Sequence, residues 1–211
     1  MVYESKAAER RDRLRDALID AAEQTIATEG LRALRARDLA AQVGCAVGAI
    51  YNAVADLDEL IYAVNARTLA ALEQTFTEAG AVGTAAPSAD GAIAQFVRLA
   101  LAYTDFADAN RPRWRALFGH QPPVGRAVPM SYMEDQLRLF SYVEKPLQVL
   151  MPATTRERRT LLARSLFSAV HGIVVLGLEE RLQLFPLPVL REQVIFLVEA
   201  MGRGLMQNDA K

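Results

Sequence analysis

Apolar side chains recur at the spacing of an amphipathic α-helix along most of the chain. The clearest stripe lies near the start and predicts a first helix over residues 5–28, with Gly30 just beyond its end. Two shorter helices are predicted over residues 36–43 and 47–53, and a tight turn joins them. The pattern therefore opens with a long helix followed by a short helical hairpin.

The remainder of the chain is also predicted to be helical. Asp56 is a suitable N-cap for a fourth helix that runs through Phe76, and Ser88 or Asp90 can cap a fifth. The later helices are predicted over residues 113–118, 130–150 (with a kink at Pro146), 155–184 (opened by a capping box of Thr154 and Glu157) and 189–206. The apolar run GIVVLGL has no partner strand, so we predict an all-α fold of about nine helices.

The segment RDLAAQVGCAVGAIYNAV, residues 37–54, has the spacing of a helix-turn-helix. Ala40 is small where one helix presses against another, and Gly44 can adopt the left-handed conformation that ends a helix. Ile50 would anchor the second helix to the core, so that its other face could enter the DNA major groove. The spacing alone has a second interpretation, because helical hairpins also occur in proteins that do not bind nucleic acid.

Composition narrows the class of protein. The chain has 211 residues, 52% of them hydrophobic and 23% charged, which is the balance of a globular protein with a sizeable core. No apolar run reaches about 18 residues without a charge, so no membrane span is expected. The charged N-terminal residues do not fit a signal peptide, and the single cysteine, Cys45, excludes an internal disulfide. We therefore expect a cytoplasmic protein.

Basic residues are unevenly placed, in one group at the start of the first helix and another just before the predicted turn, although the formal net charge of the chain is −1. They are Lys6, Arg10, Arg11, Arg13, Arg15, Arg32, Arg35 and Arg37. Acidic residues lie between them, among them Glu9, Asp12, Asp16 and Asp38. Two interpretations therefore stay open: the basic residues contact DNA phosphates, or they belong to a salt-bridged helix face in water.

Residues 21–60 resemble the DNA-binding domain of the TetR family of bacterial transcriptional regulators. The resemblance rests on ordered, closely spaced positions, namely Ala21, Ala22, Glu29, Gly30, Leu39, Ala40, Val43, Gly44, Gly48, Ile50, Tyr51, Glu59 and Leu60. It implies a homodimer that binds a pseudo-palindromic operator in double-stranded DNA and releases it when a small-molecule effector binds. It also implies a helix-turn-helix DNA-binding domain at residues 1–55 and an effector-binding and dimerisation domain at residues 56–211.

The predicted recognition helix and its surroundings depart from the family pattern. Ala46 stands where the family usually has a capping Ser or Thr, Val54 replaces the usual Phe, and Leu57 replaces a frequent Lys. The helix has no Lys or Arg, so base reading would depend on a few polar side chains, on backbone amides and on apolar contacts. The candidate DNA-binding residues are Arg35, Arg37, Ala46, Val47, Gly48, Ala49, Tyr51 and Asn52.

The segment RPRWRALFGH, residues 111–120, together with His171 and Gly172, resembles the C-terminal domain of a TetR subgroup named for its Trp, His and Gly. A regulated domain of this kind needs an apolar cavity with a few orienting polar groups. The candidate ligand-binding residues are Tyr103, Trp114, Phe118, Tyr132, Met133, Phe140 and His171, which favour an apolar or weakly polar effector. Aromatic residues at helical spacing also have a plainer interpretation as core.

The last two predicted helices have more apolar surface than one small core needs. The candidate dimer-interface residues are Leu166, Phe167, Val170, Ile173, Val174, Ile195, Val198 and Met201. Small residues among them, including Ser165, Ala169 and Gly172, would allow close approach between helices. These helices form either a buried hairpin within a monomer or a four-helix dimer interface, and the family resemblance favours the interface.

Signals for catalysis are weak. His120 and His171 have no metal-ligand spacing with another His, Cys or Asp, and there is no glycine-rich phosphate loop. We therefore expect neither an enzyme nor a cofactor or metal site. The predicted function is a ligand-responsive DNA-binding transcriptional regulator, a homodimeric repressor. The alternative is a helical dimer that binds a small molecule or a partner protein and has weakened DNA binding.

Overall fold

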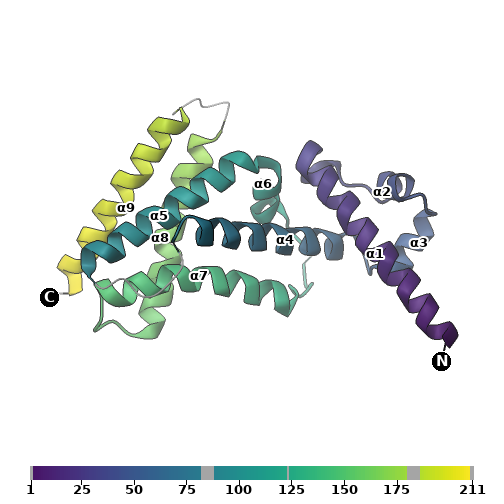
Figure 1. The fold of residues 1–211 in the computed structure, drawn as a ribbon, viewed down its shortest axis with the longest axis horizontal. Helices are drawn as coiled ribbons and strands as arrows, with labels where there is room; N and C mark the ends of the chain where they lie inside the picture. Colours follow the sequence, from purple (N-terminus) through teal and green to yellow (C-terminus); the bar gives the residue numbers. More distant parts are fainter. Residues whose placement is uncertain (1, 82–87, 123, 180–185, 210–211) are drawn as a thin grey trace. The chain divides into compact units, whose positions relative to one another are not determined.

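The computed structural model describes residues 2–81, 88–122, 124–179 and 186–209. Their elements, in chain order, are α1 (Val2–Glu29), the 3-10 helix η1 (Leu31–Ala33), α2 (Ala36–Val43), α3 (Val47–Ala53), α4 (Leu57–Glu78), α5 (Ala89–Ala109), α6 (Arg111–Gly119), α7 (Met130–Leu150), α8 (Arg156–Gly177) and α9 (Leu187–Asp209) (Figure 1). No β-strand occurs in these ranges. The predicted all-α fold is confirmed.

The helical hairpin of α2 and α3 begins and ends at the predicted residues. Gly44 adopts the left-handed conformation, with φ 73° and ψ 36°. The amide of Cys45 donates to the carbonyl oxygen of Ala40 at 2.9 Å, and the amide of Gly44 donates to that of Ala41 at 3.3 Å. These two bonds form a Schellman motif, which satisfies the last carbonyls of α2 and turns the chain into α3.

Side-chain caps open α4 and α5 as expected. The Oδ1 atom of Asp56 accepts a hydrogen bond from the amide of Glu59 at 2.9 Å, and the Glu59 carboxylate accepts one from the amide of Ala55 at 2.8 Å. At the start of α5, the Ser88 hydroxyl accepts a bond from the amide of Gly91 at 3.1 Å. Ser88, rather than Asp90, is therefore the cap of α5.

The start and the end of α8 differ from the prediction. The cap is Thr155, whose hydroxyl accepts a bond from the amide of Arg158 at 3.3 Å, so the expected box of Thr154 and Glu157 is displaced by one residue. The helix ends at Gly177, and the chain leaves helical conformation at Leu178. Gly177 lies against Leu190 of α9. Most of the predicted continuation to residue 184 lies outside the described residues.

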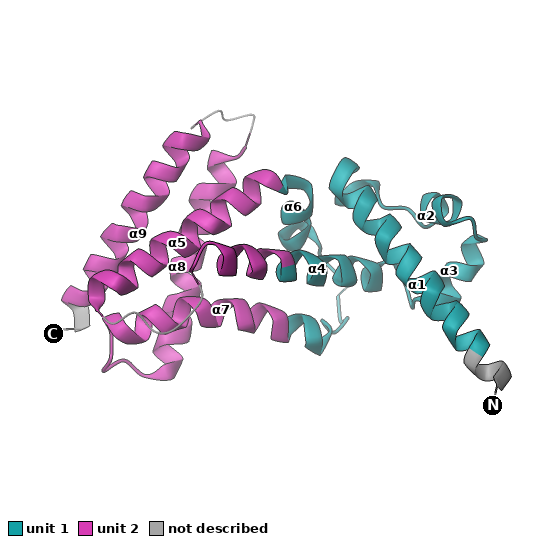
Figure 2. Ribbon diagram, in the orientation of Figure 1, with its two compact units in different colours: residues 1–70, 110–133 teal, residues 71–109, 134–211 magenta. Residues whose placement is uncertain are grey.

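Two compact units divide the chain (Figure 2). Unit 1 comprises Met1–Ala70 and Asn110–Met133, and unit 2 comprises Ala71–Ala109 and Glu134–Lys211. Helix α6 therefore belongs to the same unit as α1, α2 and α3, although the sequence placed it with the later helices. The functional division into residues 1–55 and 56–211 stays a prediction, since packing and function need not share a boundary.

The core of unit 1 explains why α6 belongs there. It is formed by buried apolar residues of several helices, and Ala116 of α6 is one of them, with only 1% of its surface exposed. The other fully buried members are Leu18, Ala22, Ile26, Leu39, Ile50, Leu60 and Val64. A segment that lies about 50 residues or more beyond these positions in the sequence therefore completes the core of the helix-turn-helix.

In unit 2, α9 packs closely on α5 and α8. The close approach depends on glycines: a Cβ atom at Gly202 would lie 2.8 Å from Cγ1 of Ile93, and one at Gly177 would lie 2.5 Å from Cδ1 of Leu190. Both neighbours are buried, so they have little room to move. As predicted, Pro146 lies inside α7.

We expect Gly202→Ala to lower the free energy of unfolding by about 1 to 2 kcal/mol, because overpacking against Ile93 outweighs the gain in helix propensity. Gly204→Ala is the matched control, since it lies two residues further along α9 with nothing within 4 Å of its Cβ position. That variant should gain about 0.5 to 1 kcal/mol. Urea unfolding of both variants measures the difference, and equal stabilisation of the two would contradict the packing described for α5 and α9.

Candidate nucleic-acid interface and ligand-binding residues

Helix α3 buries one side and exposes the other. Ile50 is fully buried and Val54 is 3% exposed, whereas Val47 is 42% and Tyr51 53% exposed. Of the remaining candidates on this segment, Ala46, Gly48 and Asn52 are exposed and Ala49 is half-buried. The exposed face therefore contains nearly all the α3 residues that the sequence assigned to DNA, and it lies opposite the side that anchors the helix.

Two candidate arginines lie at the start of α2, and both are exposed. Nη1 of Arg35 donates to the carbonyl oxygens of Arg32 at 2.6 Å and Leu34 at 2.9 Å, which holds the guanidinium group of this side chain on the turn before α2. Among the described residues, Arg37 has no side-chain hydrogen bond or ion pair. Its guanidinium group is therefore available for a phosphate.

The basic residues of α1 divide between the two interpretations of the sequence. Nε of Arg15 is 3.0 Å from a carboxylate oxygen of Glu59, and Arg11 has a looser pair with Asp12 at 3.7 Å. Lys6, Arg10 and Arg13 are exposed and form no ion pair within the part of the chain that is described. These three occur at helical spacing, so they lie on a similar side of α1.

The seven candidate ligand-binding residues divide between the two units. Trp114 and Tyr132 are buried in unit 1, where Phe118 is 46% exposed and Met133 is half-buried. The Trp114 and Phe118 rings are in edge contact, with centroids 5.8 Å apart. The remaining candidates, Tyr103, Phe140 and His171, belong to unit 2.

In unit 2 the structure brings the three candidates around Phe167. The Phe167 ring centroid lies 5.5 Å from those of Tyr103, Phe140 and His171, and it stacks on the imidazole. The Tyr103 hydroxyl and Nδ1 of His171 are 2.6 Å apart, which is a hydrogen bond. The sequence placed Phe167 at the dimer interface, although its spacing of four residues from His171 is a helical contact signal.

Burial lowers the pKa of the His171 imidazole below its ordinary value. The ring is therefore neutral near pH 7, and its hydrogen bond to Tyr103 lies among aromatic rings. Such surroundings suit an uncharged ligand better than an ion, because a charge would have to be desolvated without a partner charge.

A groove of about 450 Å³ lies elsewhere in unit 2, between α5 and α9. It is lined by Asp90, Ile93, Ala94, Val97, Arg98, Glu199 and Arg203, none of which is a candidate from the sequence. Three of its charged groups have internal partners: Arg203 pairs with Glu199 at 2.9 Å, and Arg98 donates to the carbonyl oxygen of Gly80 at 3.2 Å. The groove is therefore a charged surface depression rather than the aromatic site that the sequence predicts.

The candidate dimer-interface residues fall into two groups that differ in burial. Leu166, Phe167, Ile173, Ile195 and Met201 are half-buried. Val170, Val174 and Val198 are buried within the chain, with 8%, 0% and 4% of their surface exposed, and the dimer-interface assignment of the eight residues stays a prediction. Val170 and Val174 lie on the inner stripe of α8, which periodicity could not distinguish from the outer one.

The outer faces of α8 and α9 carry large exposed apolar residues that the sequence reasoning missed. They are Leu161, Val175, Leu176, Val189 and Phe196, and Phe196 is 70% exposed. By length and composition, helix α8 is also apolar enough to cross a membrane. Only 22% of its most apolar 18-residue stretch is buried inside the protein. One such helix is weak evidence for a membrane span, and it fits a face that packs against another protein equally well.

The described residues contain no group of three or more His, Cys, Asp or Glu side chains that could hold a metal ion. Cys45 is a free thiol in the turn between α2 and α3, and it is half-buried. These side chains offer no assembled metal centre within the described ranges.

Comparisons with protein families and solved structures identify the family of the chain. Residues 96–201, half of its length, match the family described as "Tetracyclin repressor-like, C-terminal domain". No curated protein matches the chain. Among solved structures, a protein of unknown function from Rhodococcus sp. RHA1 is 25% identical, with 94% of this chain and 96% of that chain covered and a TM-score of 0.62.

Two further structures share the fold at lower identity. A TetR-like transcriptional regulator from Rhodococcus sp. RHA1 is 17% identical over 88% of this chain and 93% of that one, with a TM-score of 0.55. A TetR family transcriptional regulator from Thermus thermophilus is 15% identical over 90% and 97%, with a TM-score of 0.52. The chain therefore belongs to the tetracycline-repressor-like (TetR) family of transcriptional regulators, which bind DNA and are generally not enzymes.

Proposed function

We propose that this protein is a homodimeric, cytoplasmic repressor that binds a pseudo-palindromic operator and leaves it when a small apolar or weakly polar effector binds. The observation that carries the proposal is the exposed face of α3 opposite the buried Ile50. In a helix-turn-helix, this is the face that enters the major groove. Two such helices, held about 34 to 36 Å apart by a dimer, would meet successive major grooves.

Base reading by α3 would be sparse. Asn52 is the side chain suited to a bidentate contact with adenine, and Val47 or Ala49 can contact a thymine methyl group. Phosphate contacts would come from Arg37 and from Lys6, Arg10 and Arg13 on α1, since α3 has no basic residue. Affinity should therefore depend strongly on salt, while sequence preference depends on few positions.

We expect Asn52→Ala to reduce discrimination between the operator and a site with one altered A·T pair by roughly 1 to 3 kcal/mol, because it removes the bidentate base contact. Gln74→Ala is the control, since the Gln74 amide donates to Glu78 within α4, away from α3. Fluorescence anisotropy with both DNA sequences, repeated across salt concentrations, measures the effect. Equal discrimination by the wild type and Asn52→Ala would remove Asn52 from the interface.

The occupant proposed for the outer face of α8 and α9 is a second copy of this chain. Its exposed apolar residues, Leu161, Leu176 and Phe196, lie on two neighbouring helices of unit 2. Ser165, Ser168 and Gly172 lie between them on α8 and would let a partner helix approach closely. A pseudo-palindromic operator requires such an isologous, two-fold interface.

Phe196→Ser should raise the dimer dissociation constant roughly 10- to 100-fold, because truncating a buried aromatic anchor costs about 2 kcal/mol or more at an interface. Leu137→Ser is the matched control, since Leu137 is 55% exposed on α7. Sedimentation equilibrium measures both constants. A monomeric wild type at micromolar concentration, or equal effects of the two substitutions, would refute this interface.

The aromatic candidates are proposed as residues that contact the effector. The neutral Tyr103–His171 pair among aromatic rings supports an uncharged ligand. Trp114 and Phe118 lie on α6, which packs directly on α1. A ligand held by these two rings would therefore act on the DNA-binding unit itself, by its differential affinity for two arrangements of that unit.

Thermal-shift screening of neutral apolar compounds should find one that lowers operator affinity. Such a compound must bind the DNA-bound protein more weakly than the free protein by the same factor. Tyr103→Phe should weaken its binding about 2- to 10-fold through the lost hydrogen bond, and leave operator affinity unchanged. Tyr142→Phe removes a hydroxyl that bonds to Glu73 instead and should have no effect. Equal affinity of the compound for free and DNA-bound protein would exclude this mechanism.

A second function, a helical dimer that binds a small molecule or partner protein with little DNA affinity, is favoured by one observation. The start of α3 has no side-chain cap, because Ala46 offers no oxygen. Salt dependence separates the two functions: a DNA-binding regulator loses affinity steeply with added salt, with a slope set by its phosphate contacts.

A further inference from the structure

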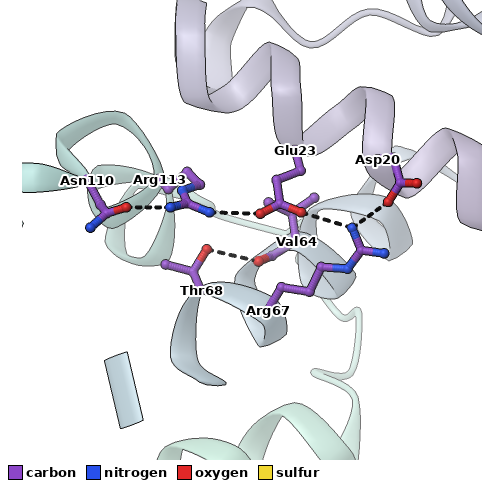
Figure 3. Close-up of polar contacts among 7 residues, drawn as sticks. All are labelled: Asp20, Glu23, Val64, Arg67, Thr68, Asn110 and Arg113. Carbon is purple, nitrogen blue, oxygen red and sulfur yellow. Dashed lines mark hydrogen bonds and ion pairs between the residues drawn. The ribbon is translucent and has the colours of Figure 1, made fainter. Parts of the chain in front are cut away.

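Glu23 of α1 divides its two carboxylate oxygens between arginines from two other helices (Figure 3). One oxygen is 2.8 Å from Nη1 of Arg113 on α6, and the other is 2.9 Å from Nη1 of Arg67 on α4. The same Arg67 nitrogen is 2.7 Å from Asp20 of α1, and Arg113 also donates to Asn110. All these groups belong to unit 1, and Glu23 and Arg113 are each about one-quarter exposed.

Ion pairs also hold α1 to α4 at a second point. Arg15 of α1 pairs with Glu59 of α4 at 3.0 Å, about two helix turns before the contacts of Glu23 with Arg67 on each helix. Helix α1 also packs directly on α2 and α3. The angle between α1 and α4 therefore sets the direction of the exposed face of α3.

The segment that follows α6 adds contacts to the start of α4. Nε2 of His120 is 3.5 Å from a carboxylate oxygen of Asp58, and Arg126 pairs with Asp56, the N-cap of α4. Helix α6 and this segment therefore contact α1 at one end and α4 at the other. Glu23 is the point where α1, α4 and α6 meet in one carboxylate.

We propose that Glu23 is a positioning residue, which transmits the position of α6 to the DNA-binding helices by fixing α1 against both α4 and α6. Apolar packing among these helices has no preferred direction, whereas a carboxylate shared between two guanidinium groups has a defined geometry. The inference rests on the proposed DNA-binding function and assigns a regulatory contact within it. With the contact intact, α1, with α2 and α3 packed on it, keeps a defined orientation relative to the first turns of α4 before DNA binds.

Glu23→Gln separates this role from simple electrostatics by the sign of its effect. Removing a negative charge from a DNA-binding unit strengthens DNA binding if charge alone matters. If Glu23 positions α1, the substitution should have the opposite effect, about a 3- to 10-fold weaker affinity. Helices α1 to α3 would then be less fixed relative to α4, and DNA binding would have to order them. Asp12→Asn is the matched control: it makes the same charge change on α1, and its loose pair with Arg11 joins no other helix.

The probe is a DNA duplex that the wild-type protein selects from a random library. Glu23→Gln should weaken its binding, and Asp12→Asn should leave it unchanged or strengthen it. The double variant Glu23→Gln with Arg113→Gln should bind no more weakly than the weaker of the two single variants, because both substitutions act through one contact.

Cys45, the single cysteine of the chain, offers a measurement without DNA. Spin labels on Cys45 of both subunits should give a broader distance distribution in Glu23→Gln than in Asp12→Asn.

The outcomes separate this inference from the proposed function. If the wild type selects no DNA, the repressor proposal itself fails, and the inference falls with it. If the wild type binds DNA and Glu23→Gln binds equally well or more tightly, with an unchanged distance distribution, the positioning role of Glu23 is refuted while the repressor proposal stands. Circular dichroism of each variant confirms that a loss of binding is not a loss of fold.

Discussion

The arrangement of the DNA-binding unit depends on the burial of Ile50. Helix α3 has only seven residues, which is too short to be stable alone in water, and it has no side-chain cap. Its helical form must therefore come from tertiary packing, in which Ile50 lies fully buried among residues of α1, α2 and α4. Because one side of α3 packs in the core, only the opposite side is exposed and can contact DNA.

In the proposed repressor, the same core would link effector binding to DNA binding. Ala116 of α6 is buried among the residues that hold α3, so the chain completes its DNA-binding unit with a segment that follows α5. A displacement of α6 would disturb this core directly, without a separate relay. The polar contacts around Glu23 lie at the border of the same packing. Apolar burial supplies the stability of the unit, and the ion pairs restrict the angles that its helices can adopt.

The sequence predicted what is local and missed what is not. The α2–α3 hairpin was predicted to the residue, because Gly44 and the apolar spacing both mark it. The membership of α6 in unit 1 depends on contacts between segments far apart in the sequence, which no periodicity encodes. The same limit applies to α8: both of its stripes are apolar, and only the packing of α5 and α9 shows that Val174 faces inward and Leu176 outward.

An exposed apolar stripe on α8 has a consequence for DNA recognition. Scattered apolar residues on a surface need no explanation, but Leu161 and Leu176 lie along one helix face with small residues between them. In the proposed dimer this face, with Phe196 of α9, sets the separation of the two copies of α3. Since α3 has few base-reading side chains, the spacing of half-sites would carry much of the specificity. Operator choice would then depend on an interface remote in sequence from the recognition helix as well as on the helix itself.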